Sequence, residues 1–188
     1  PYGATIQPAT SRLLCERCLY DLTAIDREIA KLGAYATGGE VTAESVSLLV
    51  AKSVDTTVFE ITKALMAGRY AAAMECLSEL FYLGEEPVSI NGAMASAFLD
   101  LYRAKALRAA NRSADDGLRQ FDYGRLSFRL TNAFRDAGRI SLPLLRRILL
   151  LLQQTDLQLK TTRVKGDILI EKTLATIILY WQREQARR

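Results

Sequence analysis

The side chains best suited to chemistry are two cysteines in the spacing Cys15-Glu-Arg-Cys18. Such a pair can contribute to a zinc site, but a structural zinc ion needs four ligands, and the sequence offers neither a second CxxC nor a histidine. A thioredoxin-type redox pair would need a neighbouring βαβ pattern, which is missing. Because residues three apart share one face of a helix, we interpret both cysteines as small apolar core side chains and expect no metal site.

Histidine is absent from the whole sequence, which excludes Ser-His-Asp triads, Cys-His pairs and imidazole general bases. The glycine-rich stretch GAYATGGE, residues 33–40, has no lysine and follows a helical pattern instead of a strand, so it is not a phosphate loop. The acidic pairs Glu85–Glu86 and Asp115–Asp116 stand at predicted helix starts, where the helix dipole accounts for them. We therefore expect no catalytic site and no cofactor in this chain.

Positive charge is concentrated in the second half of the sequence. Residues 101–188 hold 18 of the 25 lysines and arginines but only 8 of the 21 acidic residues. A surplus of this size is typical of a protein with a polyanionic partner. It is equally compatible with arginines that simply cover solvated helix faces.

Two basic clusters stand out within that half. One comprises Arg103, Lys105, Arg108 and Arg112, and the other comprises Lys160, Arg163 and Lys165. Cations near the end of a helix stabilise it in any case, which explains both clusters without a ligand. The second cluster, however, lies in a predicted connection beside a glycine, where three cations could equally contact phosphates.

Apolar residues recur at helical spacing along almost the whole sequence, and we find no convincing strand-like alternation. The pattern predicts an all-α protein of about ten helices. Residues Ser53–Leu80 form a predicted helical hairpin that turns at Gly68, with Asp55 or Thr56 as the cap of its first helix.

Three later helices have clear signals. Pro87 should begin a long helix that runs to about Ala110, because proline is well tolerated in the first turn. A shorter helix should span Arg125–Asp136. The helix that follows is apolar nearly all round at Ile148–Leu152, which predicts that other helices surround it.

We predict two domains, residues 1–50 and 54–188. The first is a small unit of short helices, in which Thr42 caps the last helix and Val41 packs onto Val46. It should have two apolar stripes, the first of Leu13, Leu14, Cys18 and Leu22 and the second of Leu22, Ile25, Ile29 and Leu32. The second is a bundle of longer helices.

Several features bear on the compartment. No apolar run is long enough to span a bilayer, so we expect no membrane association. No secretory leader precedes the fold, and three cysteines make an odd number for a disulfide framework. These features favour a reducing cytoplasm.

Three segments in this order carry a family resemblance. They are GGEVTAESVSLLVAKSVDTTVFEITKALMAGRYAAAMECLSEL, GEEPVSINGAMASAFLDLYRAKAL and GRISLPLLRRILLLLQQTDLQLKT, which begin at Gly38, Gly84 and Gly138. Together they resemble the C-terminal two-thirds of the delta subunit of bacterial DNA polymerase III, a part of the clamp loader. The resemblance covers nearly the whole chain, from about Thr10 to the final helix.

The resemblance implies a specific architecture and role. Residues 1–50 would be most of a small helical middle domain of the AAA+ lid type, and residues 54–188 would be the collar that holds a five-subunit loader together. The module that grips the sliding clamp would lie before Pro1. The expected partners are loader subunits of the gamma/tau and delta-prime types, with primer–template DNA in the assembled complex. The chain itself would be a non-catalytic part of a DNA-directed DNA polymerase holoenzyme.

The resemblance also implies site residues. The connection between the last two collar helices would lie near the DNA, with Arg163, Lys165 and Lys160 on the phosphate backbone. A collar helix must also present apolar side chains to its neighbours. The candidates are Phe59, Tyr82, Leu83 and Phe98, although each could equally be a core residue.

An alternative remains open on the residues alone. The stretch SADDGLRQFDYGRLSFRLTNAFRDAG, residues 113–138, resembles a short helix-turn-helix. Together with the basic half, it fits a free-standing helical DNA-binding regulator that dimerises and prefers a sequence.

Overall fold

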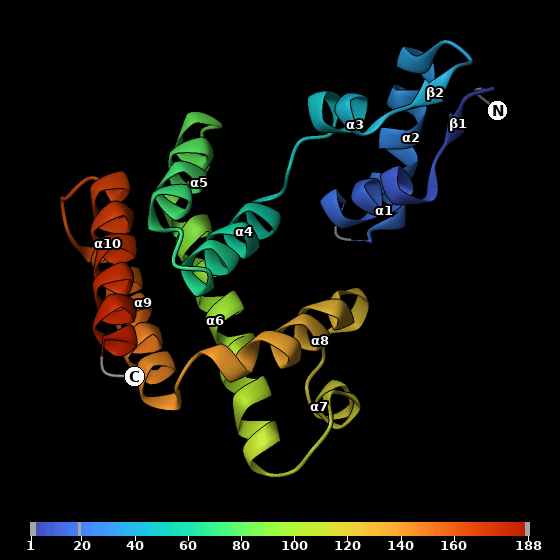
Figure 1. Ribbon diagram of the computed structural model, residues 1–188. Coiled ribbons are helices and arrows are strands. Elements are labelled where there is room, and N and C mark those ends of the chain that lie inside the picture. The colour runs from blue at the N-terminus through green and yellow to red at the C-terminus, as the bar shows by residue number, and fades with distance from the viewer. Residues whose placement is uncertain (1–2, 19, 187–188) are drawn as a thin grey trace. The chain divides into compact units, whose positions relative to one another are not determined.

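The computed structural model describes residues 3–18 and 20–186, and it divides into two compact units, Pro1–Thr56 and Thr57–Arg188 (Figure 1). The division lies within the first turn of helix α4, which begins at Val54. Each unit has its own buried core, so the two are described separately.

The first unit consists of three helices and a minimal sheet. These are α1 (Pro8–Arg17), α2 (Leu22–Ala36) and α3 (Ala43–Leu49), with the two-residue parallel strands β1 (Thr5–Ile6) and β2 (Glu40–Val41). The buried core side chains are Leu14, Cys18, Leu32, Val41, Val46 and Val50. The strand pair is too short to give the alternation by which a sequence predicts a sheet.

Helix α3 begins as predicted. The Thr42 hydroxyl accepts a hydrogen bond from the Ser45 amide at 3.2 Å, and the Ser45 hydroxyl lies 3.1 Å from the Thr42 amide, so the two residues form a reciprocal capping box. Val41 and Val46 are both buried beside this cap. The predicted stripe on α2 is wrong at two positions, because Leu22 and Ile29 are 74% and 43% exposed.

The second unit is wholly helical across its described residues, which confirms the predicted all-α class. Its α-helices are α4 (Val54–Met66), α5 (Tyr70–Tyr82), α6 (Pro87–Ala109), α7 (Ala114–Gln120), α8 (Ser127–Asp136), α9 (Leu142–Thr161) and α10 (Gly166–Gln185). Short 3-10 turns, η1 (Gly124–Leu126) and η2 (Ala137–Arg139), flank α8. Figure 1 shows α6 running through the middle of this unit, and it contacts α7, α8, α9, α10 and η2.

The hairpin of α4 and α5 forms where the sequence predicted it, with one different cap. Gly68 adopts a φ of 70°, and the Arg69 amide bonds the Ala64 carbonyl at 2.9 Å, so a left-handed glycine ends α4. At the N-terminus of α4, the Ser53 hydroxyl accepts a hydrogen bond from the Thr56 amide at 3.2 Å. Ser53 therefore caps this helix, and the prediction of Asp55 or Thr56 was wrong.

Helix α9 is less enclosed than its composition predicted. Ile148 and Leu152 are fully buried, but Leu150 is 58% exposed. Leu157 lies seven residues further on, on the same face, and is 62% exposed. The prediction that other helices surround Ile148–Leu152 is therefore wrong within this chain, and α9 carries a partly uncovered apolar face.

A buried carboxylate ties α6 to the elements on one side. Asp100 is only 5% exposed, and it accepts a hydrogen bond from the Tyr123 hydroxyl at 2.6 Å and from Arg129 Nε at 2.9 Å. Arg129 also donates to Ser96 on α6 at 2.8 Å. Burial, followed by the hydrogen bond to Asp100, raises the pKa of Tyr123 to about 12, so this hydroxyl remains a donor at neutral pH. The network thus fixes α8 and the α7–α8 connection against α6.

Replacing Asp100 with alanine should lower the free energy of unfolding by about 3 kcal/mol, because Arg129 would be left in a largely buried site without its carboxylate. Urea denaturation of the Asp100→Ala variant measures this change. Asp115→Ala is the matched control, since Asp115 is an exposed aspartate in the first turn of α7, and it should cost less than about 1 kcal/mol. Equal losses in the two variants would contradict the proposed role of the network.

Candidate interaction surfaces

The basic connection predicted from the sequence lies between α9 and α10, at residues 162–165. Lys160, in the last turn of α9, is exposed and forms an ion pair with Asp156 at 2.7 Å. Arg163 and Lys165 are also exposed, and within the described residues neither side chain makes a hydrogen bond or an ion pair. The side chains of Arg163 and Lys165 are thus available to an outside anion, and Lys160 beside them would first have to leave Asp156.

The connection is held against the start of α6 by a close backbone approach. A Cβ atom on Gly166, the first residue of α10, would lie 2.7 Å from Pro87 Cγ and 3.3 Å from Leu159 Cδ2. Pro87 is the first residue of α6, and Leu159 is in α9. Glycine is therefore required here by packing, and the contact fixes where the connection lies.

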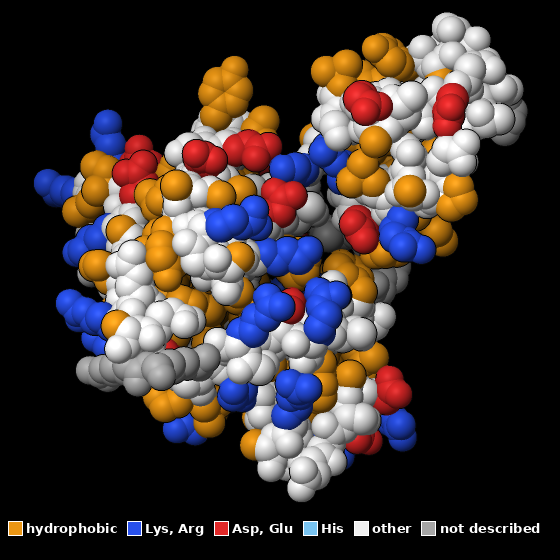
Figure 2. All heavy atoms as spheres, in the orientation of Figure 1, with side chains coloured by type: hydrophobic (Ala, Val, Ile, Leu, Met, Phe, Trp, Pro, Cys, Tyr) orange, Lys and Arg blue, Asp and Glu red, His pale blue; other side chains and the backbone are white. Residues whose placement is uncertain are grey.

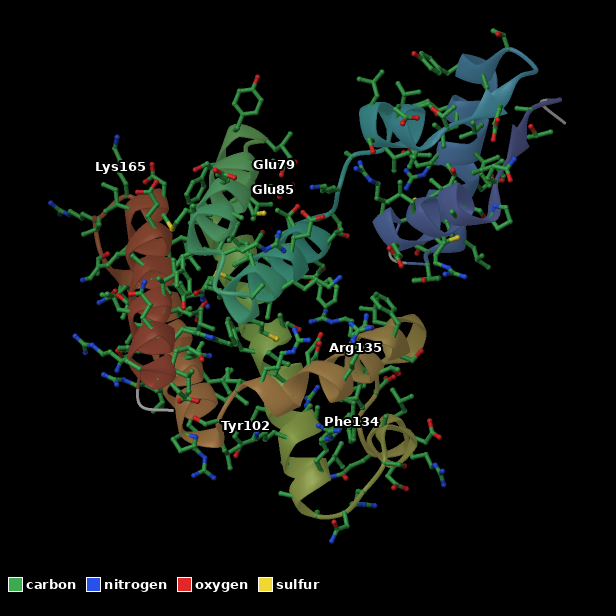
Figure 3. All side chains as sticks on the ribbon, in the orientation of Figure 1. Glu79, Glu85, Tyr102, Phe134, Arg135 and Lys165 are labelled. Atoms are coloured by element: carbon green, nitrogen blue, oxygen red, sulfur yellow. The ribbon has the colours of Figure 1, made fainter. Side chains whose placement is uncertain are left out.

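The same contact places four helix ends together. The N-terminus of α6 directly follows the C-terminus of α5, and α5 also contacts α10. Figure 3 shows Lys165 at the N-terminus of α10, on the same side of the unit as Glu79 and Glu85, which lie near the C-terminus of α5. We call this region the end surface and define it by residues 79–88 and 160–168.

The end surface carries two of the predicted interface residues. Tyr82 is 90% exposed and Leu83 is 52% exposed. Three further apolar residues on the same surface were not predicted: Val88, Val164 and Ile168 are 46%, 50% and 52% exposed. Its charge is unevenly divided, with Glu79, Glu85 and Glu86 on the α5–α6 side and three cations with Asp167 on the α9–α10 side. This arrangement suits a partner that contacts apolar and charged groups together.

The other two predicted interface residues lie elsewhere. Phe98 is 1% exposed, so the hypothesis that it faces a neighbour is wrong: it points into the core from the buried side of α6. Phe59 is half-buried, and the Lys63 ammonium group lies 4.5 Å from the centre of its ring. Helical spacing alone did not distinguish Phe98 from an exposed residue, because α6 is buried on several sides.

Further apolar side chains are exposed on the last two helices. They are Leu150 and Leu157 on α9 and Leu179 on α10. The run of four leucines at residues 149–152 was the sequence signal for this exposed apolar face, since one helix in a small unit cannot bury apolar side chains all round. Figure 2 shows hydrophobic atoms between charged ones over much of the visible face of the molecule.

The cysteine pair has the character of core residues. Cys18 is 8% exposed, and burial, followed by the charge of Glu28, raises the pKa of its thiol. Cys15 is half-buried, and both cysteines are free. Across residues 3–18 and 20–186, no three His, Cys, Asp or Glu side chains come together in a way that could hold a metal ion. Over the same residues, no helix has the length and apolarity needed to cross a membrane.

Comparisons with known proteins identify a family and a similar solved structure. A family model for the C-terminal domain of the DNA polymerase III delta subunit matches residues 55–177. Among solved structures, the chain is similar to the Bacillus subtilis DNA clamp loader delta protein, with a TM-score of 0.84 and 22% sequence identity. The likeness covers 94% of this chain and 52% of that one, so this chain spans about half the length of that relative. No curated protein matches the sequence.

Adding a methyl group at the anchor of the connection should disturb it. We expect Gly166→Ala to lower the free energy of unfolding by about 1–3 kcal/mol, because the new Cβ would overlap Pro87. Gly92→Ala is the matched control, since Gly92 is an exposed glycine within α6 whose added Cβ has nothing within 4 Å. That variant should instead be more stable by up to about 1 kcal/mol. Thermal and urea unfolding of both variants distinguish these signs, and a neutral Gly166→Ala change would refute the packing argument.

Proposed function

The chain belongs to the family formed by the C-terminal domains of DNA polymerase III delta subunits, and from this membership we propose that it is a non-catalytic part of a DNA clamp loader. The observation that carries the proposal is that the family match spans nearly all of the second unit, whose exposed surfaces suit binding to other macromolecules. A role in bacterial DNA replication would also put the protein in the cytoplasm.

Each unit has a proposed part in this function. Residues 1–50 correspond to the small helical middle domain of the AAA+ lid type, and residues 54–188 correspond to the collar. The separate core of each unit supports this assignment. In such an arrangement the collar keeps the loader subunits together, while contact with the sliding clamp belongs to a module outside this chain.

Docking to the other subunits would use apolar side chains that the chain does not bury itself. The expected partners are loader subunits of the gamma/tau and delta-prime types. Tyr82 is the strongest candidate, because a tyrosine that is 90% exposed on an ordered helix end gains contact area at a small entropy cost when it docks. Leu83 lies beside it, and Phe59 is a second, half-buried candidate on α4.

Contact with primer–template DNA would use the basic connection between α9 and α10. Arg163 and Lys165 are exposed and have no ion pair in the described residues, so binding a phosphate would break no contact within the chain. Lys160 would exchange its pairing with Asp156 for a phosphate. Such contacts hold the DNA backbone and carry no sequence preference.

The alternative, a DNA-binding regulator with a helix-turn-helix, has less support. Its recognition helix would be α8, but Leu130 and Ala133 of that helix are buried. Arg129, one of the two arginines of that helix, is bonded to Asp100 and Ser96. The family match also covers this whole stretch, because residues 113–138 lie within residues 55–177.

The assembly role predicts a stable complex with the partner loader subunits of the same organism. Size-exclusion chromatography should show the chain co-eluting with them. The double variant Tyr82→Ser/Leu83→Ser should bind about tenfold more weakly, as expected when apolar anchors of an interface are removed. Leu22→Ser is the control, because Leu22 is 74% exposed but lies outside residues 55–177, which the family model matches. Absence of any complex with correctly folded chain would end the proposal.

The DNA role predicts a loss of affinity that depends on salt. In the assembled complex, the variant Lys160→Gln/Arg163→Gln/Lys165→Gln should bind primer–template DNA more weakly for all sequences. The slope of log affinity against log salt should fall by about 0.9 for each lost phosphate contact. The control Lys172→Gln/Arg183→Gln removes two exposed cations of α10 that lie outside the connection. An unchanged slope in the first variant would refute contact at this connection.

A further inference from the structure

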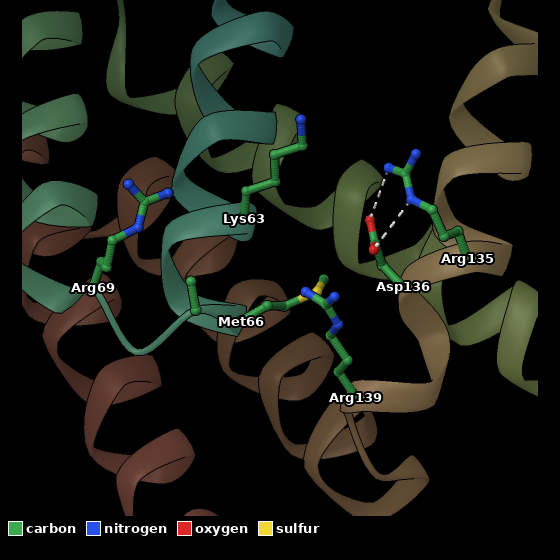
Figure 4. A pocket seen from close by; sticks show the side chains of 7 residues that line it. Lys63, Met66, Arg69, Arg135, Asp136 and Arg139 are labelled. Carbon is green, nitrogen blue, oxygen red and sulfur yellow. Dashed lines mark hydrogen bonds and ion pairs between the residues drawn. The ribbon is translucent and has the colours of Figure 1, made fainter.

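A second basic site lies away from the α9–α10 connection, between α4 and the end of α8. A pocket of about 290 Å³ is lined there by Lys63, Met66, Ala67, Arg69, Arg135, Asp136 and Arg139. Figure 4 shows these side chains on two facing walls, one from α4 and the turn into α5, the other from α8 and η2. All of them belong to the second unit, so the pocket is a feature of that unit alone.

Positive charge dominates the lining. Four of the seven residues are cationic, with Lys63 and Arg69 on one wall and Arg135 and Arg139 on the other. The one acidic residue, Asp136, is paired with Arg135 at 3.4 Å. The lining therefore keeps a net charge of three positive units. Lysines and arginines also gather over α4 and α8 in Figure 2.

The rest of the lining limits what kind of anion can bind. Met66 and Ala67 are its apolar members, and no aromatic ring is present among the lining residues on which a base could stack. A volume of about 290 Å³ is at the small end of ligand pockets. Three guanidinium groups, by contrast, are suited to bidentate hydrogen bonds with phosphate oxygens. The chemistry therefore favours phosphate groups over a whole nucleoside.

Both walls of the pocket are held by contacts behind it. The Lys63 ammonium group lies over the Phe59 ring, which holds the side chain near its wall. The Lys105 ammonium group donates to the Ala137 carbonyl at 3.1 Å and so fixes η2 to α6. Arg69 is the N-cap residue of α5, so the positive end of that helix dipole lies at the pocket. The first turn of α5 has no acidic residue that would offset this positive end. A pre-formed site of this kind does not have to gather its cations upon binding.

We propose that this pocket is a binding site for phosphate groups, supplied either by a free polyphosphate or by the backbone of a nucleic acid. It is separate from the proposed DNA contact at Arg163 and Lys165 and does not depend on it. A phosphate would lie between the two walls, with Arg69 and Arg139 as donors from opposite sides and Lys63 as a further charge.

The test uses the full chain titrated with two probes, inorganic pyrophosphate and a single-stranded oligonucleotide. Amide and arginine side-chain NMR signals report where each probe binds, and calorimetry gives the affinity. We expect saturable shifts at residues 63–69 and 135–139 with at least one probe. Binding of pyrophosphate alone identifies a free polyphosphate site, and binding of the oligonucleotide at these residues identifies a backbone site.

Three variants test whether the cations of this pocket bind the phosphate. Arg69→Gln/Arg139→Gln should weaken binding about tenfold or more, because a charge-assisted donor is lost from each wall. Lys63→Gln/Arg69→Gln changes only exposed residues of the α4 side, so it tests the site even where the first variant folds poorly. Arg146→Gln removes one exposed cation from α9 and should leave the affinity unchanged. No saturable shifts at these residues, or equal losses in all three folded variants, would overturn the proposal.

Discussion

Helix α6 must bury most of its circumference, and the rest of the second unit is arranged to satisfy that requirement. It contacts α7, α8, α9, α10 and η2, and a helix covered on so many sides leaves little freedom to the elements around it. The one carboxylate in its buried stretch, Asp100, is neutralised by Arg129 and bonded by Tyr123. A buried charge without such partners would cost several kcal/mol. The need to pair Asp100 with Arg129 therefore holds α8 against α6.

Both of the proposed binding surfaces depend on this arrangement. The first residue of α6, Pro87, packs against Gly166 and so helps to fix the end surface, which carries both the basic connection and exposed Tyr82. On the other side, α8 and η2 are anchored to α6 and form one wall of the phosphate pocket. The unit thus combines a packed interior with surfaces that have both charge and exposed apolar area. Such a design suits a protein whose role in a clamp loader is to bind its neighbours.

Local signals allowed much of this fold to be predicted from the sequence. Pro87 begins a helix, Gly68 ends one and Thr42 caps another, because each acts through its own backbone conformation or a hydrogen bond within one turn. Burial was harder to predict, since the face that a helix buries depends on partners distant in sequence. Phe98 is in the core and Leu150 is exposed, although both lie in apolar helices. The phosphate pocket joins residues 63–69 to residues 135–139, and no spacing within one segment indicates such a site.

The unit around α6 should therefore be fully formed before it meets a partner, with binding acting on its surfaces alone. Hydrogen exchange measured by mass spectrometry, on the free chain and on the chain with its partner loader subunits, tests this expectation most directly. We predict that peptides from residues 90–107 exchange slowly and equally in both states, while peptides from the end surface gain protection in the complex. Rapid exchange of α6 in the free chain, with protection gained only upon binding, would contradict a pre-formed unit.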